Sequence, residues 1–237
     1  MSALPVLCFP PAGCSASFFG PWRRRSGRLR VVPVELPGRE RRFAEPAHVE
    51  LASLVRALVP ELLAEIGDAR RVAVFGHSFG AVLGFEVVRA MTRLAGGPGL
   101  ELVVSGSAAP GVPRGVPVAG LPDDELLAGV RRMTGWHDPV LDEPEMRELL
   151  LPALRADVMM HEAYDPGPLE PLPVPVTALR GQDDPLVSAA GAARWAAVTD
   201  GGFRLAELPG GHMYLTEAWS AVLELLERVL AGERVGR

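Results

Sequence analysis

Short runs of apolar residues alternate along this chain with longer stretches in which apolar positions recur at helical spacing. The runs that have the length of buried strands are residues 6–9, 30–36, 72–75, 100–105, 175–179 and 203–208. Residues 49–66 show an amphipathic helix pattern, and Pro60 within it is expected to kink the helix. Alternation of this kind predicts a mainly parallel sheet covered by helices on both faces, which is an α/β fold.

The third run leads into Gly76-His77-Ser78-Phe79-Gly80, the G-x-S-x-G pattern of a nucleophile elbow. In such an elbow a strand turns sharply into a helix, and the glycines at both ends suit the crowding because they have no Cβ atom. Residues 81–94 have helical composition, so the Phe79 amide would lie at a helix N-terminus beside the serine. The pattern predicts Ser78 as a nucleophile, against the alternative of a tight turn with an incidental serine. His77 is expected to pack in the core.

A serine nucleophile needs a base, and in this architecture the base follows it along the chain after an acid. Three histidines follow Ser78, namely His137, His161 and His212. His212 stands in a glycine-rich turn, residues 209–214, where a loop can bring an imidazole over the sheet edge. His161 lies within a helical pattern and is expected on the surface or on an insertion. We therefore predict that His212 is the general base.

The acid is expected after the fifth apolar run, where the chain reads Arg180-Gly181-Gln182-Asp183-Asp184-Pro185. Successive residues of an extended turn point in different directions, so only one aspartate is expected to reach His212. We favour Asp184, because Pro185 restricts the backbone just after it. Asp183 remains the alternative, and its other role would be an Asx-type hydrogen bond to the local backbone.

The strand and helix alternation breaks at about residues 109–172. This segment opens with three prolines and continues with two helical patterns, residues 123–134 and 143–164. The second pattern carries a stripe of large apolar side chains, which is typical of packed core. The stripe is too broad for one helix seam, so it also suits a lid that covers an acyl-binding groove. We expect a lid insertion above Ser78, with a plain structural insertion as the alternative.

The length, net charge and amino-acid composition of the chain exclude several classes of function. A chain of 237 residues can form one α/β domain with a complete core, so we expect a single domain over residues 1–237. The formal charge of −5 comes without a charged tail, so nucleic acid is not an expected partner. All 24 basic residues are arginine. The absence of lysine excludes Schiff-base chemistry and a P-loop, and the absence of asparagine excludes N-glycosylation.

Cys8 and Cys14 do not make a disulfide scaffold, and Cys8 is expected in the core. Cysteine and histidine show no metal-ligand spacing, so we predict neither a metal nor a cofactor. The chain enters its first apolar run without the charged and apolar regions of a secretory signal, and it has no run of 18 apolar residues. We therefore expect a cytoplasmic protein without a membrane span, and take a monomer as the default.

Six segments of the sequence carry a combined signature: residues 8–13, 15–19, 36–40, 76–80, 154–157 and 210–215. Together they resemble the motifs of type II thioesterases, which are stand-alone α/β-hydrolases that serve polyketide and non-ribosomal peptide synthases. The resemblance extends from about Leu4 to about Leu230. Cys14 departs from it, because the family pattern continues with glycine there, and a change in loop geometry or thiol sensitivity is an open question.

The resemblance implies hydrolysis of acyl groups held as thioesters on the phosphopantetheine arm of an acyl or peptidyl carrier protein, which would be the partner. It also implies an editing role that clears stalled or wrong acyl units. By the same resemblance, the catalytic residues are Ser78, Asp184 and His212. The oxyanion hole falls on the backbone amides of Phe79 and Ala12.

Five arginines within eight positions form a candidate footprint for an acidic carrier protein, with a solvated surface loop as the alternative; they are Arg23, Arg24, Arg25, Arg28 and Arg30. Other activities also stay open. A general carboxylesterase or lipase would use the same residues on oxoesters, and an acyltransferase would pass the acyl group to an alcohol or amine. A non-catalytic binding protein is disfavoured, because the serine, acid and histidine all occur in the required order.

Overall fold

The computed structural model of the protein describes residues 3–25, 27–113 and 115–233, so the ends of the expected 1–237 domain lie outside the described residues. Six strands form one sheet in which every neighbouring pair is parallel. They are β1 (Leu4–Phe9), β2 (Leu29–Pro33), β3 (Arg71–His77), β4 (Gly99–Ser105), β5 (Val176–Gly181) and β6 (Phe203–Leu208). The predicted parallel α/β sheet is confirmed, although β2 ends three residues before the apolar run does.

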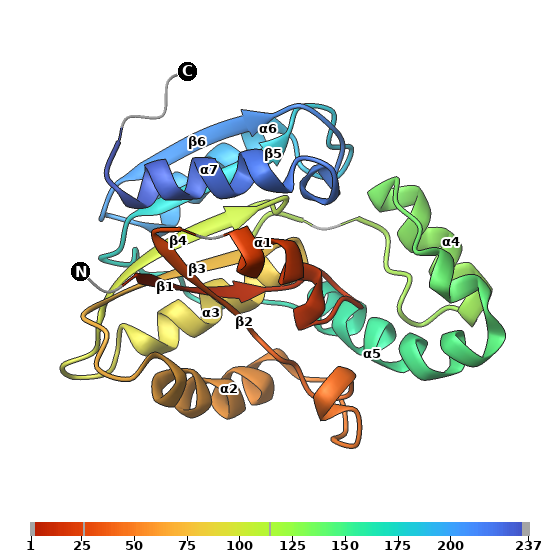
Figure 1. The fold of residues 1–237 in the computed structure, drawn as a ribbon. Helices are drawn as coiled ribbons and strands as arrows, with labels where there is room; N and C mark the ends of the chain where they lie inside the picture. Colours follow the sequence, from red (N-terminus) through yellow and green to blue (C-terminus); the bar gives the residue numbers. More distant parts are fainter. Residues whose placement is uncertain (1–2, 26, 114, 234–237) are drawn as a thin grey trace.

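Helices cover both faces of this sheet, with α2 and α3 together on one side (Figure 1). The α-helices are α1 (Gly20–Arg25), α2 (Leu51–Ile66), α3 (Phe79–Met91), α4 (Asp123–Thr134), α5 (Pro144–Glu162), α6 (Ala189–Ala193) and α7 (Trp219–Leu230). Short 3₁₀ turns lie between them: η1 (Ala16–Phe19), η2 (Glu40–Arg42), η3 (Pro139–Asp142), η4 (Arg194–Val198) and η5 (Tyr214–Thr216). Pro60 lies inside α2, which continues past it as one helix.

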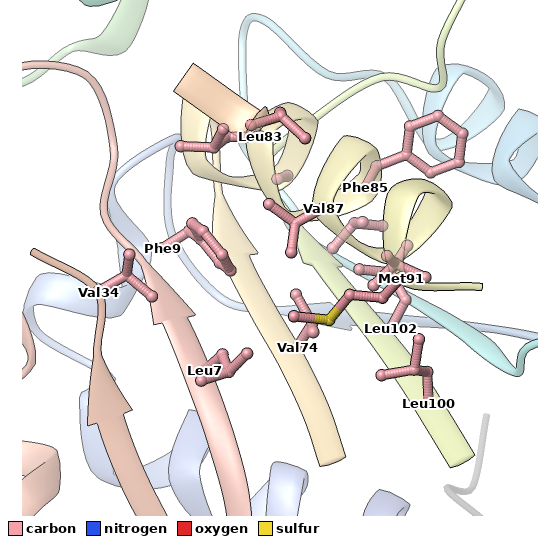
Figure 2. Close-up of a cluster of buried hydrophobic side chains, with 14 of the residues drawn as sticks. Leu7, Phe9, Val34, Val74, Leu83, Phe85, Val87, Met91, Leu100 and Leu102 are labelled. Carbon is pink, nitrogen blue, oxygen red and sulfur yellow. The ribbon is translucent and has the colours of Figure 1, made fainter. Parts of the chain in front are cut away.

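The inner strands β1 and β3 are nearly continuous apolar runs because both of their faces are buried, whereas the edge strand β6 has exposed positions. On β3, Val74 faces the core that contains α2 and α3, whereas its neighbour Phe75 faces the core that contains α1 and α7. Figure 2 shows the first of these cores, in which strand side chains meet Val87 and Met91 of α3. In the second, the ring of Trp22 on α1 lies 4.9 Å from the ring of Phe75.

The strand order β2-β1-β3-β4-β5-β6 places a topological switch point between β1 and β3. From β1 the chain adds a strand on one side, and all later strands lie on the other side. In open α/β sheets a crevice forms outside the carboxyl ends of the strands at such a point, because the connections leave in opposite directions. The loop after β1 and the turn after β3 border this crevice, and the turn after β3 carries Ser78.

The segment between β4 and β5 leaves the layered structure, and α4 stands away from the sheet (Figure 1). Both helices predicted for it are present, as α4 and α5. They form a small core of their own, in which Leu126 of α4 packs with Leu154 and Val158 of α5. Near the end of α5, Met160 belongs to the main core instead. The insertion is therefore anchored to the body of the protein through α5.

Candidate active site

Ser78 occupies a strained turn between β3 and α3, with φ of 55° and ψ of −118°. A non-glycine residue with positive φ is uncommon, because its Cβ atom crowds the backbone, and it persists only when the surrounding structure holds it. The Ser78 amide donates to the Ser105 carbonyl at 2.8 Å, and the Ser78 carbonyl accepts from the Ala81 amide at 3.0 Å. The turn is thus held from both sides.

The two elbow glycines are required by close backbone contacts, as the sequence led us to expect. A Cβ atom on Gly76 would lie 2.6 Å from the Ala81 nitrogen, and the Gly80 carbonyl lies closer still. A Cβ atom on Gly80 would lie 2.5 Å from the Pro10 carbonyl oxygen. The first turn of α3 therefore packs directly on the loop that follows β1.

Hydrogen bonds join Ser78, His212 and Asp184 in a chain. His212 Nε2 lies 3.0 Å from Ser78 Oγ, and His212 Nδ1 lies 3.0 Å from Asp184 Oδ2. The other carboxylate oxygen of Asp184 accepts from the amides of Leu186 at 2.8 Å and Val187 at 3.1 Å. The side chains of His212 and Asp184 are buried. This is the arrangement that turns a serine into a nucleophile.

Asp183 lies outside the series of hydrogen bonds that joins Ser78, His212 and Asp184. It is exposed, and its amide donates to the Gly210 carbonyl at 3.0 Å. Of the two aspartates that compete in the sequence, the structure therefore brings Asp184 to His212 and leaves Asp183 outside. The hydrogen bond from the Asp183 amide holds the loop after β5, which carries Asp184, against the loop that carries His212.

Burial raises the pKa of the Asp184 carboxyl, but the hydrogen bond and charge of His212, with the amides of Leu186 and Val187, outweigh it and lower this pKa below its ordinary value. The carboxylate is therefore ionised at neutral pH and can orient His212. Because the folded-state pKa is lowered, this interaction stabilises the protein above the ordinary carboxyl pKa and is lost as pH falls through the lowered value.

The two residues whose backbone amides the resemblance implies as oxyanion donors both lie beside Ser78. Phe79 is the first residue of α3, so its amide points out of a helix N-terminus next to Ser78. Ala12 lies in the loop after β1, and it borders the same hollows as Ser78 and His212. Among the described residues, neither amide has a hydrogen-bond partner, so both are free to donate to a substrate.

Two small hollows meet at Ser78 and His212, with volumes of about 80 and 150 Å³. Both share Val130 and Thr134 of α4 as lining residues. The smaller hollow also contacts the loop after β1, and the larger one reaches Val158 on α5. The insertion therefore lines both hollows beside the serine.

His77 is fully buried, as predicted, and it belongs to a polar network behind the site. His77 Nδ1 lies 2.8 Å from Ser105 Oγ, which in turn lies 2.6 Å from the Tyr214 hydroxyl. Burial, and then the charge of His212, lower the pKa of His77 well below its ordinary value. His77 stays neutral although its ring centre is 5.1 Å from that of His212, so it adds no second positive charge beside the imidazole.

His137, His161 and Cys14, which were also considered from the sequence, are not part of the hydrogen-bonded series at Ser78. His137 Nε2 lies 2.8 Å from Asp142 within the insertion, and His161 lies on α5 with its ring centre 6.2 Å from that of Phe79. Burial, followed by the charges of Asp138 and Asp157, raises the pKa of the Cys14 thiol to about 12. Cys14 is therefore protonated at neutral pH and is not a reactive thiolate.

Part of the arginine cluster lies at the edge of the sheet opposite the site. Leu29 pairs with Leu4, so Arg28 and Arg30 stand at the amino ends of the strands, opposite the Ser78 edge. Arg30 forms an ion pair with Glu65 at 2.9 Å, and Arg25 one with Glu224 at 3.6 Å. These observations favour the alternative, a solvated and partly paired surface.

Within the described parts of the chain, no three histidine, cysteine or acidic residues are grouped to hold a metal ion. No helix there is long and apolar enough to cross a bilayer.

Some contacts near the site were not foreseen from the sequence. Arg39 and Asp157 form a buried ion pair beside the loop after β1, although they are 118 residues apart. Ser105 and Tyr214 join His77 in the polar network. The only sequence signal for Arg39, Asp157 and Tyr214 was their place in motif segments, and it assigned them no role.

An elbow serine, a histidine and a buried aspartate at the carboxyl edge of a parallel sheet define a serine hydrolase of the α/β-hydrolase fold. Comparison with known families narrows this class, because a model of the thioesterase domain matches residues 4–230. The chain therefore belongs to the thioesterase family, and the resemblance to type II thioesterases is confirmed.

Individual relatives agree with this placement in sequence and structure. A "Probable cadicidin biosynthesis thioesterase" of Streptomyces griseus is 36% identical over 98% of this chain and 64% of its own length. A Brevibacillus parabrevis protein named "Linear gramicidin dehydrogenase LgrE" is 34% identical over 98% of this chain and 89% of its own. The solved structure of the type II thioesterase BorB from the borrelidin biosynthetic cluster is 38% identical, with a TM-score of 0.85 over 95% of this chain and 92% of that one.

The elbow geometry predicts a large difference between two glycine substitutions. Gly80→Ala places a methyl group against the Pro10 carbonyl, so we expect a loss of about 3 kcal/mol in unfolding free energy. Gly120→Ala is the matched control, because a Cβ atom there meets nothing within 4 Å. Urea unfolding followed by circular dichroism measures both. Equal stability of the two variants would contradict the close approach of α3 to the loop after β1.

Proposed function

We propose that this protein hydrolyses acyl thioesters on the phosphopantetheine arm of acyl or peptidyl carrier proteins, and so clears wrong or stalled acyl units from a polyketide or non-ribosomal peptide synthase. The observation that carries the proposal is the hydrogen-bonded chain from Ser78 through His212 to Asp184, in a fold shared with thioesterases of such pathways. We also propose that the protein works in the cytoplasm as a single-domain monomer.

In the proposed mechanism, His212 takes the proton of Ser78 as Oγ attacks the thioester carbonyl, and Asp184 stabilises the resulting imidazolium. The amides of Phe79 and Ala12 donate to the oxyanion, and each such donor is worth roughly 10²–10³ in rate. The pantetheine sulfur leaves with the proton from His212. Water then attacks the acyl-enzyme with His212 as base, which releases the acid and restores Ser78.

The size of the site supports short acyl groups as substrates. The hollows of about 80 and 150 Å³ are below the range of roughly 300–1,000 Å³ that holds drug-sized ligands. Apolar side chains of Val130, Val158 and Val187 are among the lining residues. A short acyl chain fits this space, whereas a long polyketide needs α4 to move outward, which is the role proposed for the insertion as a lid.

The name of one relative suggests hydride transfer, and the sequence of this chain gives no support for it. A dinucleotide site of the Rossmann type needs a G-x-G-x-x-G turn between a strand and a helix. The sequence contains no such pattern, and the turn after β3 is the serine elbow.

Replacement of the serine should abolish turnover. We expect Ser78→Ala to lower kcat on an acyl-pantetheine thioester by on the order of 10⁶, as for nucleophile deletions in other serine hydrolases. The fold should persist, because the substitution removes one oxygen atom and adds none. The rate is measured by thiol release, with labelling by a fluorophosphonate as a second readout. Near-normal hydrolysis by this variant would exclude Ser78 as the nucleophile.

The two adjacent aspartates provide a matched pair of isosteric variants. Asp184→Asn should reduce kcat by about 10⁴, because an uncharged amide cannot hold His212 in the required tautomer or stabilise its charged form. Asp183→Asn should leave kcat nearly unchanged, since the Asp183 side chain is exposed and away from His212. Steady-state kinetics on the same thioester compares them. A larger effect at Asp183 would transfer the acid role to it.

The substrate class is tested with one acyl panel presented in three forms: loaded on a carrier protein, as free pantetheine thioesters and as matched oxoesters. We expect the highest kcat/KM on the carrier, and faster release of acetyl and propionyl than of long chains. Ser78→Ala provides the background rate. Rapid oxoester cleavage with indifference to the carrier would make the protein a general esterase, and acyl transfer to an added alcohol or amine in preference to water would make it an acyltransferase.

A further inference from the structure

Arg39 and Asp157 form an ion pair in the protein interior beside the active site. Arg39 Nη1 lies 2.6 Å from Asp157 Oδ2, and Arg39 Nη2 lies 2.9 Å from Asp157 Oδ1, so the pair is bidentate. The two side chains are 4% and 0% exposed, respectively, which removes the pair from solvent screening. Arg39 follows β2, and Asp157 lies on α5 of the insertion. The pair therefore links the insertion to the body of the protein.

Both members of the pair also bind the loop that carries Ala12. The Gly13 amide donates to Asp157 Oδ2 at 2.9 Å, and Arg39 Nη1 donates to the Cys14 carbonyl at 3.0 Å. These bonds engage the two residues that follow Ala12. The loop directly after Ala12 is thus held by the side chains of two distant segments of the chain.

Packing holds the same loop against α5. Leu154, one turn before Asp157, lies so close to Gly13 that a Cβ atom there would be 2.8 Å from Leu154 Cδ1. Gly13 has φ of 74°, a conformation that glycine adopts without strain. Ala12 packs against both the main core and the core of the insertion. The loop after β1 is therefore where the two cores meet.

Strained backbone positions occur at the active site and next to Arg39. Among the described residues, Glu40 and Ser78 are the two non-glycine residues with positive φ, at 46° and 55°. Ser78 is the elbow serine, and Glu40 directly follows Arg39. Strain of this kind costs free energy and persists where the surrounding structure requires a particular geometry. The strained position at Glu40 is adjacent in sequence to Arg39, which binds Asp157.

Stability alone is a poor explanation for the pair. Removing two charges from water is costly, and well-packed apolar side chains of similar volume often replace a buried ion pair without loss of stability. Arg39 Nε is also buried without a hydrogen-bond partner, which adds to the cost. A pair that is costly and incompletely satisfied, yet bound to two consecutive residues of the loop after β1, points to a role in geometry.

We propose that Arg39 and Asp157 are positioning residues that hold the Ala12 amide toward the oxyanion and couple its position to helix α5. The inference rests on the proposed function, because it assigns Ala12 to the oxyanion hole. An oxyanion donor acts mainly in the transition state. Loss of the Arg39–Asp157 pair therefore lowers kcat while KM changes little. Removal of one whole donor costs 10²–10³ in rate, and a displaced donor costs less, about tenfold to a hundredfold.

The test compares two uncharged double variants, Arg39→Met/Asp157→Leu and Arg39→Met/Asp157→Asn. Both remove the ion pair without leaving a lone buried charge, and leucine and asparagine have the same branched shape. The difference on which the test relies is that asparagine keeps an oxygen that can accept from the Gly13 amide. We expect the leucine variant to be at least tenfold slower than the asparagine variant in kcat, at similar KM and similar stability to urea.

A fluorophosphonate serves as a second probe, because its rate of reaction with Ser78 also depends on the oxyanion donors and needs no knowledge of the natural acyl group. The leucine variant should again react at least tenfold more slowly. Equal rates for the two folded variants would overturn the positioning role. Full hydrolysis by Ser78→Ala would instead overturn the proposed function, so the two failures are distinguishable.

Should the leucine variant fail to fold, Arg39→Lys decides the question. Lysine keeps the positive charge beside Asp157, but its single ammonium group cannot span both carboxylate oxygens and the Cys14 carbonyl. We expect a fall of about threefold to tenfold in kcat and in labelling rate at unchanged KM, and wild-type values would overturn the proposal. The control is Arg147→Met, which breaks the exposed ion pair to Asp124 between α5 and α4 and should leave both rates unchanged.

Discussion

The site depends on one close approach of backbone to backbone. At the switch point between β1 and β3, the first turn of α3 lies so near the loop after β1 that only glycine fits at position 80. This contact brings the Phe79 amide, the Ser78 side chain and the Ala12 amide to the same place. A larger residue at position 80 would move the helix away from the loop, and the two amides could no longer form the proposed oxyanion hole together.

Burial and hydrogen bonding together determine which of the groups around His212 are charged. Asp184 is buried yet ionised, because His212 and two backbone amides compensate for the lost hydration. His77 is buried and neutral, although it lies beside His212. One negative charge therefore faces the imidazole, and no second positive charge opposes it. That balance suits the general-base role proposed for His212.

The parts of the structure that depend on local sequence could be predicted, and those that depend on distant contacts could not. The apolar runs predicted the six strands, and the elbow pattern placed Ser78 between strand and helix. The choice of Asp184 over Asp183 rested on Pro185, and the structure adds the reason in the amides of Leu186 and Val187. No spacing rule connects Arg39 with Asp157, because tertiary folding brings them together across 118 residues.

The insertion lines the space for the acyl group and also contacts the loop after β1, so its position affects both substrate size and the geometry of the site. Its helix α4 packs in a core separate from the main core, so α4 can shift without unpacking the sheet. Leu154 and Asp157 of α5 nevertheless contact Gly13, next to the Ala12 amide. A shift of α5 large enough to admit a bulky acyl group would therefore disturb the oxyanion loop, whereas a shift confined to α4 would not. Under the proposed function, selection of acyl groups by size therefore falls to α4, while α5 stays in place to keep the site intact.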